Sequence, residues 1–273
     1  MNERPPIRIL SINTWKCDGD YELRMQALVR QMMSVDPDII TIQESFRTTD
    51  GAIDTAALLA SKFGMQYRFA QARRKIRTFK AREIESDSGL ATLSRLPILA
   101  AERLVLPTDS PTEERVALLT TIDWHGALVN IANVHFTHLP DRLPLKRAQL
   151  GAVLDALAAD DEMVCRIKLI CGDFNTPLSQ REELLSGQDT WTFLDSYVLG
   201  GGPSDRATIR GIGVDWPEPV CIDYILYARK STESVRVRFE TSAIVLNQPD
   251  EHTGVFPSDH FGVMTTMSFL NGG

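Results

Sequence analysis

The chain has 273 residues, of which 43% are hydrophobic and 24% are charged. This composition is typical of a folded globular protein with a sizeable core, and it excludes a disordered chain. The 29 basic side chains are outnumbered by 36 acidic ones, which gives a formal net charge of -7. A protein that holds nucleic acid or an anionic membrane mainly by its overall charge is therefore disfavoured, and any polyanionic partner has to be recognised locally.

Neither a domain boundary nor a membrane segment is visible in the sequence. No Pro-, Gly- or Ser-rich linker is long enough to separate two domains, so we expect residues 1–273 to form a single domain. The N-terminal segment lacks the apolar stretch of a signal peptide, and no run approaches about 18 apolar residues. The four cysteines form no CxxC pair, which disfavours a disulfide scaffold and a structural zinc site. We therefore expect a cytoplasmic protein without stable membrane insertion.

Short apolar runs alternate with amphipathic stretches along the chain. Residues 7–12 predict a strand, and apolar side chains between 25 and 32 then follow at the spacing of a helix. Residues 38–42 predict a second strand, and residues 53–63 a second helix that ends at Gly64 with a left-handed cap. Further strands are expected at 88–94, 115–122, 127–134, 167–171, 222–227, 234–245 and 261–269, with another helical spacing at 150–157. This order favours a layered α/β domain with mixed sheets, and the absence of GxGxxG or GxxxxGK after the first strand disfavours nucleotide-binding α/β folds.

Polar side chains follow or interrupt these apolar strands at many of their ends. In open α/β sheets ligands collect beyond strand ends, so these side chains could converge on one site. Most of them alone are better explained as turn residues or solvated strand ends, but the set together is poorly explained in that way. Asp223 is the exception, because its carboxylate is embedded in an apolar run and needs a partner if it is buried. The set comprises Asn13, Gln43-Glu44, Asn133, His135, Asp173, Asn175, Asp223, Asp259 and His260.

The residue types at these positions narrow the chemistry. Carboxylates and amides without paired cysteines suit a hard cation, Mg²⁺ or Mn²⁺, and the absence of HExxH disfavours catalytic zinc. Two histidines with separate carboxylates suit acid–base work, because a carboxylate fixes the tautomer of an imidazole and raises its basicity. Asp259 and His260 are adjacent, so on a regular strand they would point to opposite faces, and a local turn or a more distant carboxylate has to orient the imidazole.

In their order along the chain, these motifs resemble the endonuclease/exonuclease/phosphatase superfamily, which includes deoxyribonuclease I, apurinic endonucleases, neutral sphingomyelinases and inositol phosphate phosphatases. The resemblance implies a deoxyribonuclease I-like fold, a four-layer sandwich of two packed mixed β-sheets flanked by helices. It also implies a metal-dependent phosphoric ester hydrolase. The resemblance covers residues 7–269 and rests on Asn13, Gln43-Glu44, Gly89-Leu90, Ser94-Arg95-Leu96-Pro97, Asn133-Val134-His135, Gly172-Asp173-Phe174-Asn175, Ile222-Asp223-Tyr224-Ile225 and Ser258-Asp259-His260.

The resemblance also implies which residues hold the metal and position the water. Glu44 is then the principal metal ligand, with Asn13 beside it holding the metal or the phosphate. Asp259 matches the acid next to the catalytic histidine and is a further candidate ligand. Asp173 orients or deprotonates the attacking water, and Asn175 donates a hydrogen bond to a phosphate oxygen.

The remaining matches concern the transition-state charge. His260, oriented by a carboxylate, is then a general base or a charge stabiliser. His135, paired with Asp223, stabilises the phosphorane or protonates the leaving oxygen. Arg115 resembles a phosphate-contacting arginine, and Thr208 stands where family members place a phosphate-contacting threonine.

One departure from the family pattern concerns the number of metal ions. Apurinic endonucleases often carry an acid two residues after the first asparagine, and Trp15 occupies that position here. Asp18 could supply a carboxylate from the same loop. The sequence therefore leaves one or two metal ions open.

A basic run and three aromatic side chains bear on the substrate. The segment 68–82 has seven basic and no acidic residues, so the rest of the chain carries 22 basic against 36 acidic side chains, a net of -14. A solvated face or mobile loop explains such a run as well as a phosphate-gripping lid does. Among Trp15, Phe46 and Tyr67, Trp15 is the best candidate for stacking on a substrate, because it closely follows Asn13.

The function favoured by the sequence is a Mg²⁺- or Mn²⁺-dependent phosphodiesterase or phosphatase in which water attacks phosphorus in line. An endo- or exonuclease on DNA or RNA is the alternative, and it would need a broader basic groove. A non-catalytic phosphate-binding module with the same fold is the second alternative, disfavoured because the candidate site residues are all present. The partner is a phosphoester substrate, either a small phosphodiester, a nucleic acid or a lipid headgroup, and no protein partner is predicted.

Overall fold

The computed structural model describes residues 4–110, 114–139, 141–159, 167–210, 218–234 and 236–270. Within these ranges twelve strands form two six-stranded sheets. The first sheet has the order β11 (Val237–Val245), β12 (Gly262–Phe269), β1 (Ile7–Asn13), β2 (Ile39–Thr48), β4 (Arg82–Ser94) and β3 (Gln66–Phe79). The second has the order β5 (Ile98–Val105), β6 (Val116–Trp124), β7 (Ala127–His135), β8 (Ile167–Asp173), β10 (Asp223–Lys230) and β9 (Trp191–Asp195).

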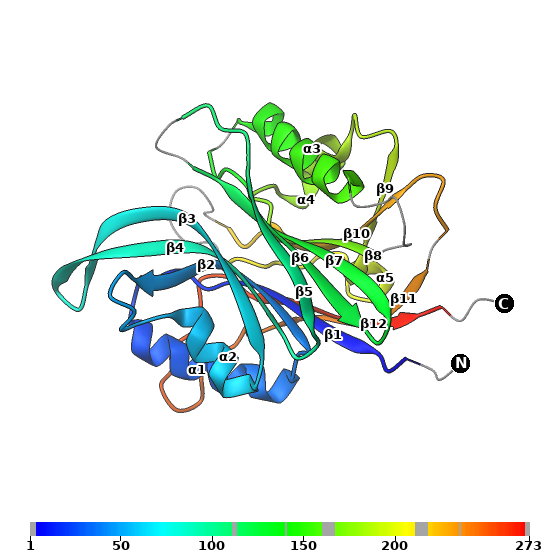
Figure 1. Cartoon of the computed structure of the whole chain (residues 1–273). Coiled ribbons are helices and arrows are strands. Elements are labelled where there is room, and N and C mark those ends of the chain that lie inside the picture. Colours follow the sequence, from blue (N-terminus) through cyan, green and yellow to red (C-terminus); the bar gives the residue numbers. More distant parts are fainter. Residues whose placement is uncertain are drawn as a thin grey trace.

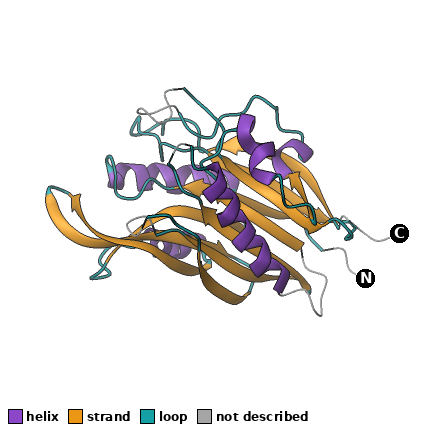
Figure 2. Ribbon diagram, turned by 90° about the horizontal axis from the view of Figure 1, so that it is seen from above, coloured by secondary structure: helices purple, strands orange, loops and turns teal. Residues whose placement is uncertain are grey.

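The sheets pack face to face, and helices cover their outer faces (Figures 1 and 2). The covering helices are α1 (Tyr21–Val35), α2 (Thr55–Phe63), α3 (Leu143–Ala159) and α4 (Leu178–Leu185). The short helix α5 (Ser196–Leu199) instead contributes Tyr197 to the apolar cluster between the sheets. Apolar side chains of α1 and α2 pack on the first sheet, and those of α3 and α4 on the second. Both sheets are mixed, because β1 and β2 are parallel, as are β7 and β8, while their other pairings are antiparallel. The expected four-layer sandwich is confirmed.

The helices begin and end where the sequence places caps. The carboxylate of Asp20 accepts a hydrogen bond from the backbone N–H of Leu23 (3.1 Å) and caps α1. Asp54 caps α2 in the same way through Ala57 N–H (2.9 Å), and α2 ends at Gly64 with φ of 63°. The left-handed cap predicted at Gly64 is therefore confirmed.

The elements that the sequence did not reveal are polar or short. β3, β5, β9, α4 and α5 were not expected, and the basic run 68–82 is a strand and turn of a long hairpin instead of a mobile loop. In Figure 1 this β3–β4 hairpin projects away from the rest of the first sheet. The sequence of β3 shows no alternation of apolar and polar residues, because charged residues occupy both of its faces. The strand was therefore not predicted.

Two buried amides connect the sheets. Gln43 in β2 donates from Nε2 to Oδ1 of Asn133 in β7 (2.8 Å). Asn133 in turn donates from Nδ2 to the carbonyls of Ile42 (3.0 Å) and Ala91 (2.9 Å) in the first sheet. Both side chains have no exposed surface. Asn133 and Gln43, expected beside the site, therefore have a structural role, because these hydrogen bonds satisfy polar groups inside the sandwich.

No helix within the described residues is long and apolar enough to cross a membrane. Cys17, Cys171 and Cys221 are buried free thiols, and Cys165 lies outside the described residues.

A buried carboxylate fixes the base of the β3–β4 hairpin. Asp87 in β4 has 1% side-chain exposure and accepts hydrogen bonds from Nε of Arg74 (2.8 Å) and Nη2 of Arg47 (3.1 Å). Burial raises the pKa of Asp87, but the hydrogen bonds from Arg74 and Arg47 outweigh it, and the pKa lies below its ordinary value.

We predict that Asp87→Asn reduces the acid sensitivity of the fold. Because the pKa of Asp87 is lower in the folded than in the unfolded chain, its contribution is complete above the unfolded pKa and is lost as the pH falls through the folded pKa. Urea denaturation at successive pH values below about 4 should show a shallower loss of unfolding free energy in the variant. An identical loss in both proteins would contradict this role.

Candidate active site

The candidate residues meet in one cleft at the end of the sandwich where β1, β2, β7 and β8 terminate. The cleft has a volume of about 640 Å³. Its floor contains Asn13, Glu44, Asp173, Asn175, Asp259 and His260, and one wall carries Glu114, Arg115, Val116, His135 and His138. The β3–β4 hairpin lines the cleft as well, and its Ala72 packs against the apolar cluster that contains Val116. Strand ends of both sheets therefore contribute to one site, as expected.

Strand register places three of the ionisable groups side by side. His135 is paired with Asp173 across the parallel strands β7 and β8, and Asp173 is paired with Asp223 across the antiparallel strands β8 and β10. Gly172 precedes Asp173 with φ of 140°, and a Cβ there would lie 2.0 Å from the carbonyl oxygen of Val134. Only glycine allows β7 and β8 to approach this closely next to the site.

Glu44 reaches the cleft because β2 bulges. The register between β2 and β4 shifts between Ile42 and Ser45, and Glu44 has a left-handed φ of 53°. The bulge lies opposite Gly89 of β4, where a Cβ would be 2.1 Å from the carbonyl oxygen of Ala70. A bulge redirects a side chain that regular alternation would have placed elsewhere. Gln43 therefore points into the core while Glu44 lines the cleft.

Lys16 forms ion pairs with two carboxylates in the cleft, Glu44 and Asp18. Oε2 of Glu44 lies 2.8 Å from Nζ of Lys16, which is also 3.5 Å from Oδ2 of Asp18. Burial lowers the pKa of Lys16, but the charges of Glu44 and Asp18 outweigh it, and the pKa is raised. The pKa of Asp259 is raised by burial, and the charge of Glu44 adds to this while the charge of His260 opposes it. Glu44 and Asp259 thus bring negative charge together in a place that attracts a cation.

Asp173 is held by two asparagines. Nδ2 of Asn13 donates to its Oδ2 (3.2 Å), and the backbone N–H of Asn175 donates to its Oδ1 (2.8 Å). Asn175 has a left-handed φ of 47°, and its own Nδ2 donates to the carbonyl of Phe136 (3.1 Å). Burial raises the pKa of Asp173 to about 7, and the neighbouring charge of Asp223 contributes. The carboxylate is therefore fixed in direction and can exchange a proton near neutral pH.

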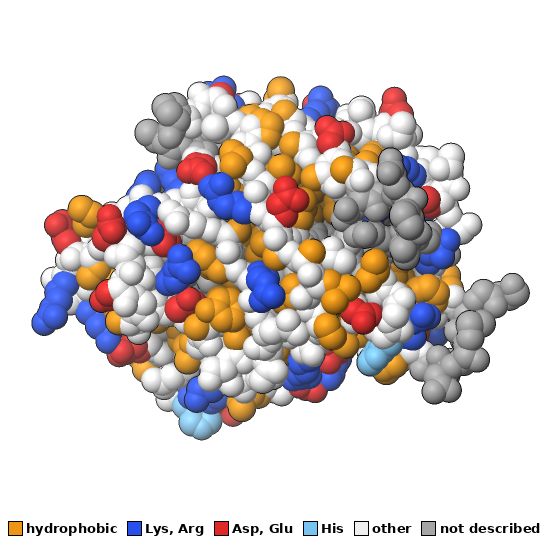
Figure 3. Space-filling model, in the orientation of Figure 1, with side chains coloured by type: hydrophobic (Ala, Val, Ile, Leu, Met, Phe, Trp, Pro, Cys, Tyr) orange, Lys and Arg blue, Asp and Glu red, His pale blue; other side chains and the backbone are white. Residues whose placement is uncertain are grey.

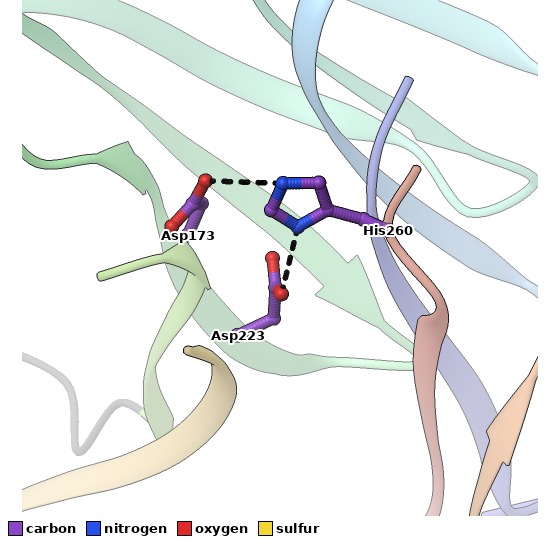
Figure 4. A group of neighbouring side chains, drawn as sticks. All are labelled: Asp173, Asp223 and His260. Carbon is purple, nitrogen blue, oxygen red and sulfur yellow. Dashed lines mark hydrogen bonds and ion pairs between the residues drawn. The ribbon is translucent and has the colours of Figure 1, made fainter. Parts of the chain in front are cut away.

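The distant carboxylate that orients His260 is Asp223 (Figure 4). Nδ1 of His260 lies 2.9 Å from Oδ2 of Asp223, and Nε2 lies 3.8 Å from Oδ2 of Asp173. Burial lowers the pKa of His260, but the charge and hydrogen bond of Asp223 outweigh it and raise the pKa to about 10. The imidazole is thus held between two carboxylates in its charged form.

The expected pairing of His135 with Asp223 is wrong. His135 instead places Nε2 at 3.5 Å from Oδ2 of Asp173, because β8 lies between β7 and β10. Burial lowers the pKa of His135 well below its ordinary value, and the charges of Arg115 and His260 add to this. Asp173 therefore stands between a charged imidazole, His260, and a neutral one, His135.

Thr208 is not a phosphate contact. It has no exposed surface, and its Oγ1 accepts hydrogen bonds from the backbone N–H groups of Ile222 (3.0 Å) and Asp223 (3.1 Å). Its hydroxyl therefore fixes the start of β10 and the position of Asp223. Arg115 does line the cleft, and its Nη2 lies 2.8 Å from Nδ1 of His138 on the same wall.

The three aromatic residues considered as substrate contacts occupy different environments. Trp15 lines the cleft, as expected of a residue that closely follows Asn13. Phe46 is fully buried, with ring centroids 5.7 Å from Tyr21 and 5.5 Å from Phe79. Tyr67 is half-buried against the apolar cluster beneath α1 and α2. Only Trp15 among the three is therefore placed to contact a substrate.

Comparison with known families agrees with this site. Residues 10–260 match the model of the Endonuclease/Exonuclease/phosphatase family. The chain belongs to this family. Its members are generally hydrolases that act on phosphoesters, and they are typically dependent on divalent metals. No curated protein matches the sequence.

Similar solved structures come from distant relatives. A family protein from Leptotrichia buccalis C-1013-b is 19% identical, with a TM-score of 0.72 over 96% of this chain and 100% of that one. The human Nocturnin catalytic domain with bound sulfate anion is 20% identical, with a TM-score of 0.72 over 99% and 97% of the two chains. A humanized D. rerio TDP2 is 17% identical, with a TM-score of 0.68 over 96% and 99%. These likenesses show the shared fold.

Sequence reasoning missed a buried arginine beneath the site of this family member. Arg24 in α1 is 1% exposed, and all five of its N–H groups donate to backbone carbonyls. Four acceptors lie in the loop after β1 and one in the segment before His260: Thr14 (2.9 Å), Trp15 (3.2 Å), Lys16 (3.0 Å), Asp18 (2.8 Å) and Pro257 (3.1 Å). An arginine on an amphipathic helix gives no signal of this in the sequence, because such residues are usually solvated.

We predict that Arg24→Met lowers the free energy of unfolding by about 3 kcal/mol or more, because several buried carbonyls lose their donor. Arg24→Lys should restore only part of this, since an ammonium group has three donors and no planar fork. Urea denaturation of the three proteins measures the difference. Equal stability of Arg24→Met and the parent protein would show that the carbonyls do not depend on the guanidinium.

Proposed function

We propose that the protein is a Mg²⁺- or Mn²⁺-dependent phosphodiesterase or phosphatase that activates water for in-line attack on phosphorus. The observation that carries this proposal is the fixed carboxylate of Asp173, which lies between the two imidazoles and faces a cleft with oxygen ligands on its floor. In this arrangement Asp173 is a proton acceptor for water, and the imidazolium of His260 places positive charge beside the position where a phosphoryl group would bind. No cysteine or serine nucleophile is required, because water is the nucleophile.

The donor set fits a hard divalent cation. Glu44 and Asp259 would hold the ion, with the amide oxygen of Asn13 beside them, and these oxygens match the preference of Mg²⁺ and Mn²⁺. The ammonium group of Lys16 at 2.8 Å from Glu44 indicates that this carboxylate already attracts a cation. When bound, the ion would offset charge on the phosphoryl oxygens during attack.

The protein's own groups account for the proton transfers. Asp173, fixed by Asn13 and Asn175, orients the water and accepts its proton. His260, held by Asp223, contributes positive charge next to the phosphoryl group. His135 lies on the other side of Asp173 and is placed to act on the leaving oxygen, while Asn175 and Arg115 are our candidates for phosphate contacts.

A second cluster of possible ligands lies beside the proposed metal site. Ligand atoms of Asp173, Asp223 and His260 all lie within 4.8 Å of one another. The hydrogen bond between Nδ1 of His260 and Asp223 uses both of those atoms, and it makes the cluster an acid–base unit in our proposal. Metal binding and catalysis should therefore be separable by mutation.

Glu44→Gln should weaken Mn²⁺ binding by about 10-fold or more, because a charged oxygen ligand is lost with little change of shape. Asp223→Asn, which removes no proposed ligand of the ion, should weaken Mn²⁺ binding much less than Glu44→Gln does. Calorimetric titration with Mn²⁺ distinguishes the two variants. The reverse outcome, with binding lost in Asp223→Asn and kept in Glu44→Gln, would place the ion among Asp173, Asp223 and His260.

His260→Ala and Asp173→Asn should each lower kcat/KM for bis-p-nitrophenyl phosphate by about 1,000-fold, which corresponds to losing one essential group. EDTA should abolish the activity, and Mg²⁺ or Mn²⁺ should restore it. His252→Ala, which removes an exposed histidine away from the cleft, is the matched control. Full activity in either site variant, or in EDTA, would overturn the mechanism.

A further inference from the structure

The fold buries one lysine of α3, Lys146, beneath the candidate site. On the face of the molecule shown in Figure 3, lysine and arginine side chains lie at the surface, interspersed with acidic ones. Lys146, in contrast, is 5% exposed and shares the buried face of α3 with Leu150 and Val153. A lysine is rarely buried to this extent unless an acceptor satisfies its ammonium group. The identity of that acceptor therefore indicates what the side chain does.

The acceptor is the backbone carbonyl of Asn175, to which Nζ of Lys146 donates a hydrogen bond. This contact joins α3 to the segment that follows β8. Burial lowers the pKa of Lys146, and the charge of Asp173 opposes this effect. The ammonium group is thus near enough to interact with the charge of Asp173. Within the described residues, however, Lys146 is not among those that line the cleft, so it acts on the site through Asn175.

Asn175 has a backbone conformation that needs support from its surroundings. Its φ of 47° lies in the left-handed region, which is unfavourable for residues other than glycine. Its backbone N–H donates to Oδ1 of Asp173 (2.8 Å), and its Nδ2 donates to the carbonyl of Phe136 (3.1 Å). Lys146 holds the other backbone polar group, the carbonyl. Such conformations persist when the surrounding contacts over-determine them, and Lys146 supplies one of these contacts.

The direction of the Asp173 carboxylate depends on Asn175. From its left-handed conformation, the N–H of Asn175 reaches Oδ1 of Asp173. The other oxygen, Oδ2, then lies 3.5 Å from Nε2 of His135 and 3.8 Å from Nε2 of His260. A change of Asn175 to an ordinary backbone conformation would withdraw this N–H and allow the carboxylate to turn. A catalytic group that is misplaced by about 1 Å loses about 100-fold in rate.

We propose that Lys146 is a positioning residue for the hydrolysis. Its ammonium group holds the carbonyl of Asn175 and thereby keeps the carboxylate of Asp173 in the direction that activates water. This inference rests on the proposed function, because it takes Asp173 as the group that orients the attacking water. Lys146 itself contacts neither the substrate nor the metal.

Lys146→Met removes the ammonium group and keeps a long side chain that fills a similar space. The kcat for bis-p-nitrophenyl phosphate should fall by about 10- to 100-fold, which is typical of losing a group that orients a catalytic residue. The KM should change by less than about threefold, because Arg115 and the residues of the proposed metal site are retained. A correctly folded Lys146→Met protein with the kcat of the parent would overturn the proposal.

Lys168→Met is the matched control for the loss of a buried lysine. Lys168 lies in β8, the strand that carries Asp173 at its other end, and is 1% exposed. Its Nζ donates to Oε1 of Glu233 (3.1 Å). Both variants should be less stable to urea than the parent protein, but Lys168→Met should keep the parent kcat when assayed below its unfolding transition. An equal loss of kcat in both would overturn the positioning role, because it would show a general effect of destabilising the sandwich.

Hydrogen exchange separates the contact from the reaction. In EDTA and without substrate, the amides of residues 173–176 should exchange about tenfold faster or more in Lys146→Met than in the parent protein, as measured by mass spectrometry. Lys168→Met should exchange there like the parent. Lys146→Gln, which keeps a neutral donor in the helix, is a second variant that should show the same increase.

The two measurements distinguish failure of the positioning role from failure of the proposed function. Faster exchange at 173–176 in Lys146→Met, with no hydrolysis of any phosphoester by the parent protein, would support the contact and refute the proposed function. Hydrolysis by the parent protein, with unchanged exchange in both Lys146→Met and Lys146→Gln, would refute the positioning role alone.

Discussion

The ion pair between His260 and Asp223 is the contact on which the site depends. His260 precedes β12 of the first sheet, whereas Asp223 begins β10 of the second, so their hydrogen bond crosses the sandwich. Both side chains are almost inaccessible to solvent. Two charges can be buried there only because each compensates the other, and loss of one would leave the other without a counter-charge. The relative position of the two sheets and the chemistry of the cleft therefore depend on the same pair.

Several residues that line the cleft have strained backbone conformations, which buried contacts hold in place. Trp15, Lys16, Glu44 and Asn175 all have left-handed φ values, which cost about 1–3 kcal/mol each for residues other than glycine. Arg24 holds the first two by their carbonyls, and the bulge opposite Gly89 holds Glu44. Such conformations persist when surrounding contacts over-determine them. The buried polar network therefore maintains the orientation of the side chains that line the cleft.

Sequence reasoning recovered the fold because most of its strands are apolar and end in residues of a recognisable order. The family resemblance that the motifs around Asn13, Glu44 and Asp173 help to carry implied the four layers and the residues of the cleft floor. The pairing of the histidines could not be obtained in this way, because it depends on β8 lying between β7 and β10. Thr208 and Asn133 were misjudged for a related reason, since a polar side chain near a strand end looks the same whether it meets substrate or backbone. The basic strand β3 has charged residues on both faces, and its period of two was therefore not visible.

The position of β12 has a consequence for how the protein is made. This strand, close to the C-terminal end of the chain, pairs with β1, near the N-terminal end, and His260 is placed by the same segment. Pairings this distant in sequence form slowly, because closing the long intervening chain costs entropy before the contact stabilises the fold. During synthesis β1 therefore lacks one of its neighbours until residues 262–269 have left the ribosome. The cleft assembles only then, so a growing chain carries no complete site, and one edge of β1 stays unpaired until β12 arrives.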